Sequence, residues 1–178
     1  MYPLRRLFLT VHRAKKQHAI ELDDVVQTPF RCMPWDIDIF LEMNNGRILT
    51  LFDLGRTDFA IRCGLMDVLK QERWGLVVAG STVRYRKRIR AFDKVVMKTR
   101  FVGIDERWFY LEQLMQVGDT PCCSALFRTG VTEKGRTVDV ARVAAAMGQK
   151  DKMSEMQLSG WQQAWSTLDS ERPWPPFE

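Results

Sequence analysis

Histidine is almost absent from this chain of 178 residues, which contains only His12 and His18. The sequence from Ala19 to Glu178 has no imidazole. A Ser-His-Asp or Cys-His site requires an imidazole held beside the nucleophile, and mononuclear zinc hydrolases usually take histidine or paired-cysteine ligands. These enzyme classes are possible only if the amino-terminal segment, with its two histidines, folds into the active site. If the protein is an enzyme, carboxylates, backbone amides and water are therefore expected to perform its chemistry.

Cysteine is also sparse, and its spacing offers no metal or disulfide framework. The four cysteines, Cys32, Cys63, Cys122 and Cys123, include no CxxC pair. Cys122 and Cys123 are adjacent, so their side chains point to opposite faces if they lie in a strand. We interpret all four as small apolar residues in a reducing compartment. We expect neither a metal nor a redox cofactor.

No apolar run in the sequence is long enough to cross a bilayer. Residues 1–18, MYPLRRLFLTVHRAKKQH, mix apolar with basic side chains, and no small-residue cleavage site follows, which argues against a secretory signal. A basic amphipathic helix lying on an anionic membrane is one interpretation. A terminal helix packed on its own domain is the other, and we favour it. We expect a cytoplasmic protein, with a peripheral membrane contact through residues 1–18 as the alternative.

The overall balance of residues is that of an ordinary globular domain. Hydrophobic residues make up 46% and charged residues 28% of the chain, and the length suits one domain with a modest core and two tails. The net charge is +5 and the sequence pI is about 9.2. This basic excess favours an anionic partner, whether a phosphate-bearing molecule, a nucleic acid or a membrane surface.

The hydrophobic pattern predicts one strand, one enclosed helix and then four strands. The first strand is expected within Ala19–Cys32 and ends at Pro34. The helix is expected to begin at the Asn44–Asn45 pair, run to Cys63 and stop at Gly64, because asparagine caps helix starts and glycine ends helices. The following strands are expected at residues 75–89, 93–102, 108–117 and 121–131.

The predicted helix is unusually apolar on all sides. Ile48, Phe52, Gly55 and Phe59 fall on one stripe at helical spacing, and the remaining faces have few polar residues, so the helix must be mostly enclosed. Short turns between the later strands imply an antiparallel meander. We therefore predict an α+β fold in which a curved antiparallel sheet of five or six strands wraps around one long central helix.

Three segments follow from this reading of the chain. Residues 1–18 form the basic amphipathic amino-terminal segment, and residues 19–148 form the main domain, which ends in a short helix at 139–147. Residues 149–178 contain a carboxyl-terminal helix near 156–168 and a proline-rich tail. No internal repeat and no boundary of a second domain is evident.

The stretch DIDIFLEMNNGR at residues 36–47, followed by FDLGR at 52–56, resembles the hotdog-fold acyl-CoA thioesterases of the 4-hydroxybenzoyl-CoA thioesterase-like group. It is most similar to their thioesterase superfamily member 6-like branch. The motif covers residues 36–56, and the order of elements extends the resemblance over 19–148. The resemblance implies a hotdog fold and hydrolysis of an acyl-CoA thioester by a homodimer or homotetramer, with coenzyme A only as part of the substrate.

The resemblance also assigns catalytic roles. The second aspartate of the family motif attacks the thioester or activates water, and it matches Asp38. Amides at the start of the helix polarise the thioester carbonyl, and they match the N–H groups of Asn45 and Gly46. Such amides have no intrahelical acceptor and carry the positive end of the helix dipole. A lost contact of this kind typically costs about 3 kcal/mol of transition-state stabilisation.

Further residues are candidates for substrate binding. An apolar channel for the acyl group is expected beside the two helix phenylalanines, and alternate arginines of the basic run at 84–90 are candidates for the coenzyme A phosphates. Asp53 pairs with Arg56 at helical spacing or serves as a second active-site carboxylate. The full set of substrate-binding candidates is Asn44, Phe52, Asp53, Phe59, Arg84, Arg86 and Arg88.

Two other functions stay open at this stage. The family's usual Gly-His pair is replaced by Leu41-Glu42, so a hotdog protein that binds acyl-CoA or fatty acid without catalysis is the first alternative. A basic membrane-surface or nucleic-acid-binding module is the second. No recognised motif for RNA or DNA accompanies the basic charge, and we do not expect a nucleic-acid partner.

Overall fold

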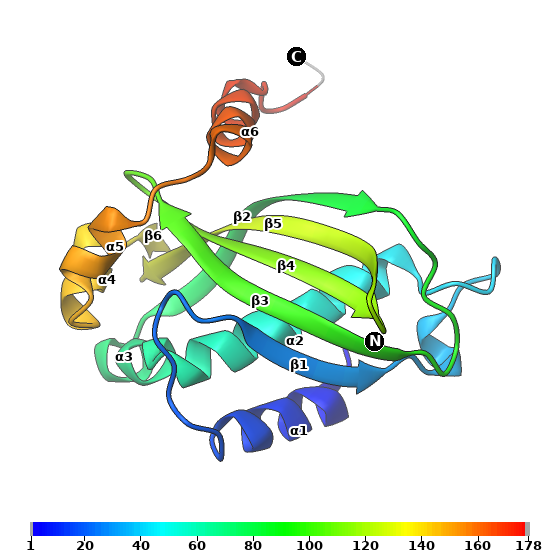
Figure 1. Ribbon diagram of the computed structural model, residues 1–178. Coiled ribbons are helices and arrows are strands. Elements are labelled where there is room, and N and C mark those ends of the chain that lie inside the picture. The colour runs from blue at the N-terminus through cyan, green and yellow to red at the C-terminus, as the bar shows by residue number, and fades with distance from the viewer. Residues whose placement is uncertain (1, 177–178) are drawn as a thin grey trace.

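A six-stranded antiparallel sheet curves around one long helix, α2 (Asn45–Arg62), in the computed structural model, which describes residues 2–176 (Figure 1). The strand order is β1-β3-β4-β5-β2, and the short β6 pairs with β5. The predicted α+β hotdog arrangement is therefore confirmed. The strands are β1 (Val26–Arg31), β2 (Gly75–Tyr85), β3 (Lys94–Ile104), β4 (Phe109–Val117), β5 (Thr120–Glu133) and β6 (Arg136–Thr137).

Helix α2 begins and ends where the sequence predicts. Asn44 is the N-cap residue, and its side-chain oxygen accepts hydrogen bonds from the amides of Gly46 and Arg47. Gly64 follows the helix with a φ of 83°, a left-handed conformation that costs glycine little. The predicted inner stripe of Ile48, Phe52, Gly55 and Phe59 is buried, so the helix is enclosed by the sheet as expected.

The centre of the interface between α2 and the sheet is polar. Gln113 of β4 is 1% exposed and donates hydrogen bonds to the carbonyl of Phe52 at 3.0 Å and to the hydroxyl of Thr99 at 2.8 Å. A Cβ atom at Gly55 would lie 2.7 Å from Gln113 and Thr99. Glycine at this position therefore allows the helix to approach the sheet closely.

Helix α1 (Leu4–Ala14) packs against α2 and along the outer edge of β1 (Figure 1), so the favoured interpretation of the amino-terminal segment is confirmed. Two ion pairs hold it, Arg6–Asp36 at 2.7 Å and Arg13–Asp58 at 3.3 Å. Both aspartates are buried. The same two arginines also donate to backbone carbonyls of the β1 edge, at Arg31 and Pro29.

Several predicted boundaries are wrong. The first strand covers Val26–Arg31 and not the whole of Ala19–Cys32, because a local turn in which Glu21 N–H donates to the Asp24 carboxylate interrupts the extended chain. Pro34 begins the short 3₁₀ helix η1 (Pro34–Asp36). A strand was expected to come next after α2, but the eight-residue helix α3 (Leu65–Glu72) precedes it.

The carboxyl-terminal segment contains more helix than predicted. Helix α4 (Val140–Ala146) has the expected cap at Asp139, but α5 (Lys150–Glu155) occupies a stretch in which no helix was predicted. Helix α6 (Gly160–Glu171) packs on the outer face of the sheet through an Arg128–Asp169 ion pair of 2.6 Å. The proline-rich tail is described only as far as residue 176. Within residues 2–176, no helix combines the length and the apolar character that a membrane span requires.

Candidate functional site

The amino end of α2 leaves one amide available. The Asn44 side chain occupies the N–H of Gly46 at 2.9 Å and that of Arg47 at 3.2 Å. The N–H of Asn45, the first helical residue, donates to no group within residues 2–176. Gly46 was expected to share the role of carbonyl polariser, but its amide is already bonded to the cap. Asn44 itself acts as a cap in this structure.

Asp38 lies in a narrow hairpin that leads directly into α2. Ile37 and Met43 form a bridge at its base, and the N–H of Asp38 donates to the carbonyl of Glu42 at 2.8 Å. One carboxylate oxygen of the half-buried Asp38 accepts the N–H of Phe40 at 2.8 Å. The second oxygen accepts no hydrogen bond from the described part of the chain, so it is available to a ligand or to water.

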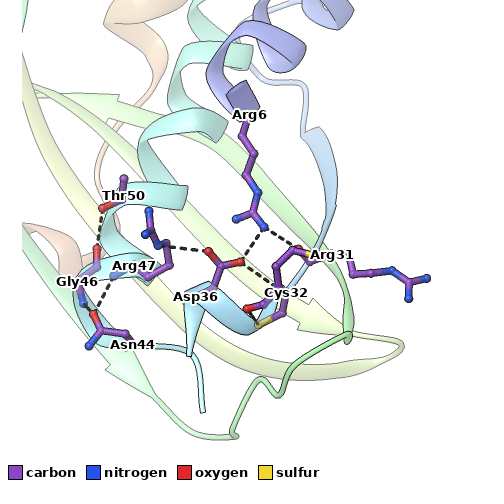
Figure 2. A network of polar contacts seen from close by, with 9 residues as sticks. Arg6, Arg31, Cys32, Asp36, Asn44, Gly46, Arg47 and Thr50 are labelled. Carbon is purple, nitrogen blue, oxygen red and sulfur yellow. Dashed lines mark hydrogen bonds and ion pairs between the residues drawn. The ribbon is translucent and has the colours of Figure 1, made fainter. Parts of the chain in front are cut away.

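Asp36, two residues earlier, holds the structure of this corner together. Its side chain is 1% exposed and accepts hydrogen bonds from the N–H of Met33 at 2.9 Å and from the Arg6 guanidinium at 2.7 Å. Arg47 of α2 approaches the other oxygen at 3.3 Å. Figure 2 shows the two arginines reaching the same carboxylate from α1 and α2. Asp36 therefore anchors the hairpin and the helix start.

The basic segment after β2 runs beside the Asp38 hairpin. The N–H of Met43 donates to the carbonyl of Ile89 at 2.8 Å, and Arg88 pairs with Glu42 at 2.9 Å. Arg88 therefore lies at the same corner as Asp38, whereas the N–H of Arg86 donates to the carbonyl of Cys122 near the start of β5. Arg84 lies elsewhere, in a groove on the outer face of the sheet beside α6.

Asp53 and Arg56 form the expected ion pair on α2, at 3.1 Å. Asp53 remains 43% exposed and also accepts the hydroxyl of Tyr2 at 2.5 Å. Burial, together with this hydrogen bond, raises the pKa of Tyr2 to about 12. The Arg56 guanidinium lies 3.8 Å from the centre of the Phe127 ring and donates to Gln113. Burial lowers the pKa of Arg56, and Asp53 opposes that shift.

The two helix phenylalanines have different surroundings. Phe52 is fully buried and packs edge to face against Phe127, with ring centres 5.7 Å apart, which is a core position. Phe59 lines an apolar cavity between α2 and the sheet. Residues of α3, α4 and α5 help to close this cavity. The residues from α3 and α5 were not predicted because neither helix was predicted, although the apolar spacing of Leu65, Val68 and Leu69 suits a helix.

The cleft at the amino end of α2 contains no histidine among its described lining residues, which are Tyr2, Trp35, Asp36, Ile37, Asn44, Gly46, Arg47 and Thr50. His12 lies on α1, where its ring stacks on Phe8. Across residues 2–176, no three His, Cys, Asp or Glu side chains are grouped to hold a metal ion. The chemistry available at this corner is that of carboxylates, backbone amides and arginines.

The fold and this corner together define a hotdog domain with a carboxylate before its central helix. Residues 32–160 match the family model of the thioesterase-like superfamily. This chain therefore belongs to the thioesterase-like superfamily.

Individual relatives agree with this assignment. The chain is 37% identical over 83 residues to Protein THEM6 of Drosophila melanogaster. This match covers 46% of this chain and 43% of that protein. It is 35% identical over 81 residues to Protein THEM6 of Xenopus laevis, covering 46% and 39%. The matches thus span about two fifths of the relatives' own length. The fold is similar to that of a thioesterase from Thermus thermophilus, solved with coenzyme A and Zn, with a TM-score of 0.60, 21% identity and coverage of 68% and 96%.

Proposed function

We propose that the protein hydrolyses acyl-CoA thioesters, with Asp38 as general base or nucleophile and the Asn45 N–H as the oxyanion donor. The observation that carries this proposal is the hairpin at residues 37–43. It joins a carboxylate with one free oxygen to the amino end of α2, where one amide has no acceptor among the described residues. Membership of the thioesterase-like superfamily supports the reaction class.

The chemistry follows from this pairing. As general base, Asp38 takes a proton from water, and the resulting hydroxide attacks the thioester carbonyl carbon. The Asn45 N–H stabilises the oxyanion of the tetrahedral intermediate. The carbon–sulfur bond then breaks and the acid is released. The coenzyme A thiolate leaves and takes up the proton that Asp38 holds, which restores the carboxylate. No histidine is needed in this scheme, in keeping with the histidine-free lining of the cleft.

Arg86 and Arg88 are proposed to contact the phosphates of coenzyme A. Their segment is tied to the Asp38 hairpin by the Met43–Ile89 hydrogen bond, and arginine suits phosphate because its guanidinium can donate two parallel hydrogen bonds. The Thermus thermophilus thioesterase that shares the fold was solved with coenzyme A. Arg84 is a weaker candidate because it lies on the outer face of the sheet.

We also propose that the protein is a homodimer, assembled through the edge of β2. This strand is the last in the sheet order and is exposed along most of its 11 residues. Leu76, Val77 and Val78 are 47%, 39% and 51% exposed. An apolar edge strand of this length is usually covered by a partner, because its unpaired backbone groups otherwise invite aggregation.

A panel of acyl-CoAs tests the proposed activity. Release of coenzyme A is measured for the natural protein, for Asp38→Asn and for Glu106→Gln, which changes an exposed carboxylate in the turn between β3 and β4. We expect Asp38→Asn to lower kcat by about 100-fold or more and to leave acyl-CoA binding intact, whereas Glu106→Gln has no effect. Full turnover by Asp38→Asn would exclude Asp38. Binding without turnover in the natural protein would favour the non-catalytic acyl-CoA-binding alternative.

The exposed face of α1 favours one additional role, a peripheral contact with anionic membranes. Leu4, Phe8 and Leu9 are 67%, 71% and 63% exposed, although the opposite face of the helix is docked on the domain. Exposed basic residues flank them at Arg5, Lys15 and Lys16. Apolar side chains with basic neighbours are typical of helices that lie in a membrane interface.

A further inference from the structure

The cavity that Phe59 lines extends along the carboxyl-terminal half of α2. Its volume is about 160 Å³, and its walls are almost entirely apolar. Strands β2, β4 and β5 form one side, and α3, α4 and α5 close the far end, where Met66, Met147 and Met153 contribute side chains. An apolar cavity of this kind suits an apolar ligand and excludes a charged one.

The two charged side chains in the lining, Asp53 and Arg56, lie toward the amino end of α2. The helix contributes Asp53, Arg56 and Thr57 to the lining first, and then Phe59, Ala60 and Cys63. From residue 53 to residue 63 the helix rises by about 15 Å. Burial raises the pKa of Cys63 to about 11, so its thiol is neutral at physiological pH and adds to the apolar end. A ligand with a polar head and an apolar tail would therefore point its tail toward Cys63.

One face of α2 borders both the cleft at its amino end and this cavity. Gly46, Thr50, Asp53 and Thr57 follow one another at spacings of four, three and four residues, which places them on the same side of the helix. Gly46 and Thr50 line the cleft, whereas Asp53 and Thr57 line the cavity. Tyr2 lines the cleft and bonds to Asp53, so it marks the junction of the two spaces.

We propose that the cavity holds the distal end of a long aliphatic acyl chain whose thioester lies at the amino end of α2. The inference rests on the proposed function and adds the substrate class to it. From Asn45 to Asp53 the helix rises by about 12 Å, a distance that acetyl and other short groups do not span. An engineered apolar cavity of about 150 Å³ takes up benzene, so the cavity here suits roughly the last six carbons of a chain. Fatty acyl groups of the palmitoyl type meet both conditions.

Filling the cavity tests this assignment. Ala60 is 5% exposed and lines the cavity, whereas Ala145 lies on the exposed face of α4. We therefore compare Ala60→Phe with Ala145→Phe and measure kcat/KM for acetyl-, octanoyl- and palmitoyl-CoA. We expect the natural protein to favour palmitoyl-CoA over acetyl-CoA by at least tenfold. Ala60→Phe lowers the palmitoyl value at least tenfold and leaves the acetyl value unchanged, and Ala145→Phe changes neither.

An enlarged cavity provides a second variant in case Ala60→Phe does not fold. Met147→Ala removes a partly buried side chain from the far end, and it should shift the preferred chain length upward by two or more carbons. An unchanged chain-length profile in this variant would overturn the proposal. Equal hydrolysis of acetyl- and palmitoyl-CoA by the natural protein would also overturn it, while leaving the proposed thioesterase function in place.

Calorimetric titration with palmitate separates the cavity from catalysis. Suppose that the natural protein hydrolyses no acyl-CoA but binds palmitate, and that Ala60→Phe or Met147→Ala changes the palmitate affinity at least tenfold. In that case the cavity assignment stands and the hydrolase proposal fails. If palmitate does not bind and all acyl-CoAs are hydrolysed equally, the hydrolase proposal stands and the cavity assignment fails.

Discussion

The two edges of the sheet differ in whether the chain itself covers them. The β1 edge is six residues long and is covered by α1, whose Arg6 and Arg13 donate to its free carbonyls and pair with the buried Asp36 and Asp58. The β2 edge is 11 residues long and carries three consecutive exposed aliphatic side chains. One edge is closed by the chain itself, and the other is the edge that we propose pairs with a second copy.

The closed β1 edge lies next to the proposed catalytic hairpin. The arginine that covers the start of the β1 edge, Arg6, also fixes Asp36, and Asp36 accepts Arg47 at the beginning of α2. Closing the β1 edge therefore also fixes the hairpin that carries Asp38. The β2 edge, by contrast, forms one wall of the proposed acyl cavity, so pairing of two copies there would cover that wall.

The largest expected effect comes from removing the anchor of the closed edge. Asp36→Ala removes the carboxylate that pairs with both Arg6 and Arg47. The side chain of Arg6 is only 19% exposed. Breaking a buried ion pair in this way typically costs about 3–5 kcal/mol. Denaturant unfolding should show that loss. Asp23→Ala, which breaks an exposed pair with Lys152, is the control and should leave the midpoint unchanged, and an equal effect of the two variants would contradict the role of Asp36.

The open edge is tested by adding charge to it. Val78→Lys places a cation in the middle of the exposed aliphatic run of β2 and should weaken association about 30-fold or more, as expected for a central interface position. Sedimentation velocity at matched concentrations should show monomer for Val78→Lys and dimer for Leu168→Lys, a change at an exposed leucine of α6. A Val78→Lys protein that remains fully dimeric would place the interface elsewhere.

A smaller effect is expected for the second arginine of the closed edge. Arg13→Ala removes one partner of Asp58, which is 0% exposed but keeps the hydroxyl of Thr28 at 2.7 Å. Because Arg13 is partly exposed and Asp58 retains a donor, the unfolding free energy should fall by only about 1–2 kcal/mol. A loss as large as that of Asp36→Ala would show that both pairs contribute equally.

The smallest effect on stability is expected on the outer face of α1. Phe8→Ser changes a side chain that is 71% exposed, so the unfolding free energy should change by less than about 0.5 kcal/mol. Sedimentation with vesicles containing anionic phosphatidylglycerol should nevertheless decrease severalfold, whereas vesicles of phosphatidylcholine alone bind neither protein. Undiminished sedimentation of Phe8→Ser would remove α1 as the membrane contact.

Local rules explain what the sequence could predict. The start of α2 at the Asn44 cap, its end before Gly64 and its buried stripe depend on neighbouring residues and a single period, so they are visible without a structure. The antiparallel meander followed from short turns in the same way. Helices α3 and α5 were missed because each is too short for periodicity to stand out and neither has a side-chain N-cap. Helix α4 is equally short, but its Asp139 cap was visible in the sequence.

The candidate site was predictable in part. The resemblance points to Asp38 as the candidate carboxylate, and one of its oxygens accepts no hydrogen bond from the described residues. The engagement of the Gly46 amide by Asn44 depends on a rotamer, and the pairing of Arg6 with Asp36 joins residues 30 positions apart. The cavity beside Phe59 depends on segments from both ends of the domain. Such long-range contacts leave no local signal.

The central claim is that Asp38 and the Asn45 N–H act on the same thioester. A crystal structure with a palmitoyl-CoA analogue in which a methylene replaces the thioester sulfur tests it directly. The carbonyl oxygen should lie about 3 Å from the Asn45 nitrogen, and the Asp38 carboxylate should reach the carbonyl carbon directly or through one water. The tail should lie in the cavity beside Ala60. An analogue bound with its carbonyl away from the start of α2 would contradict it.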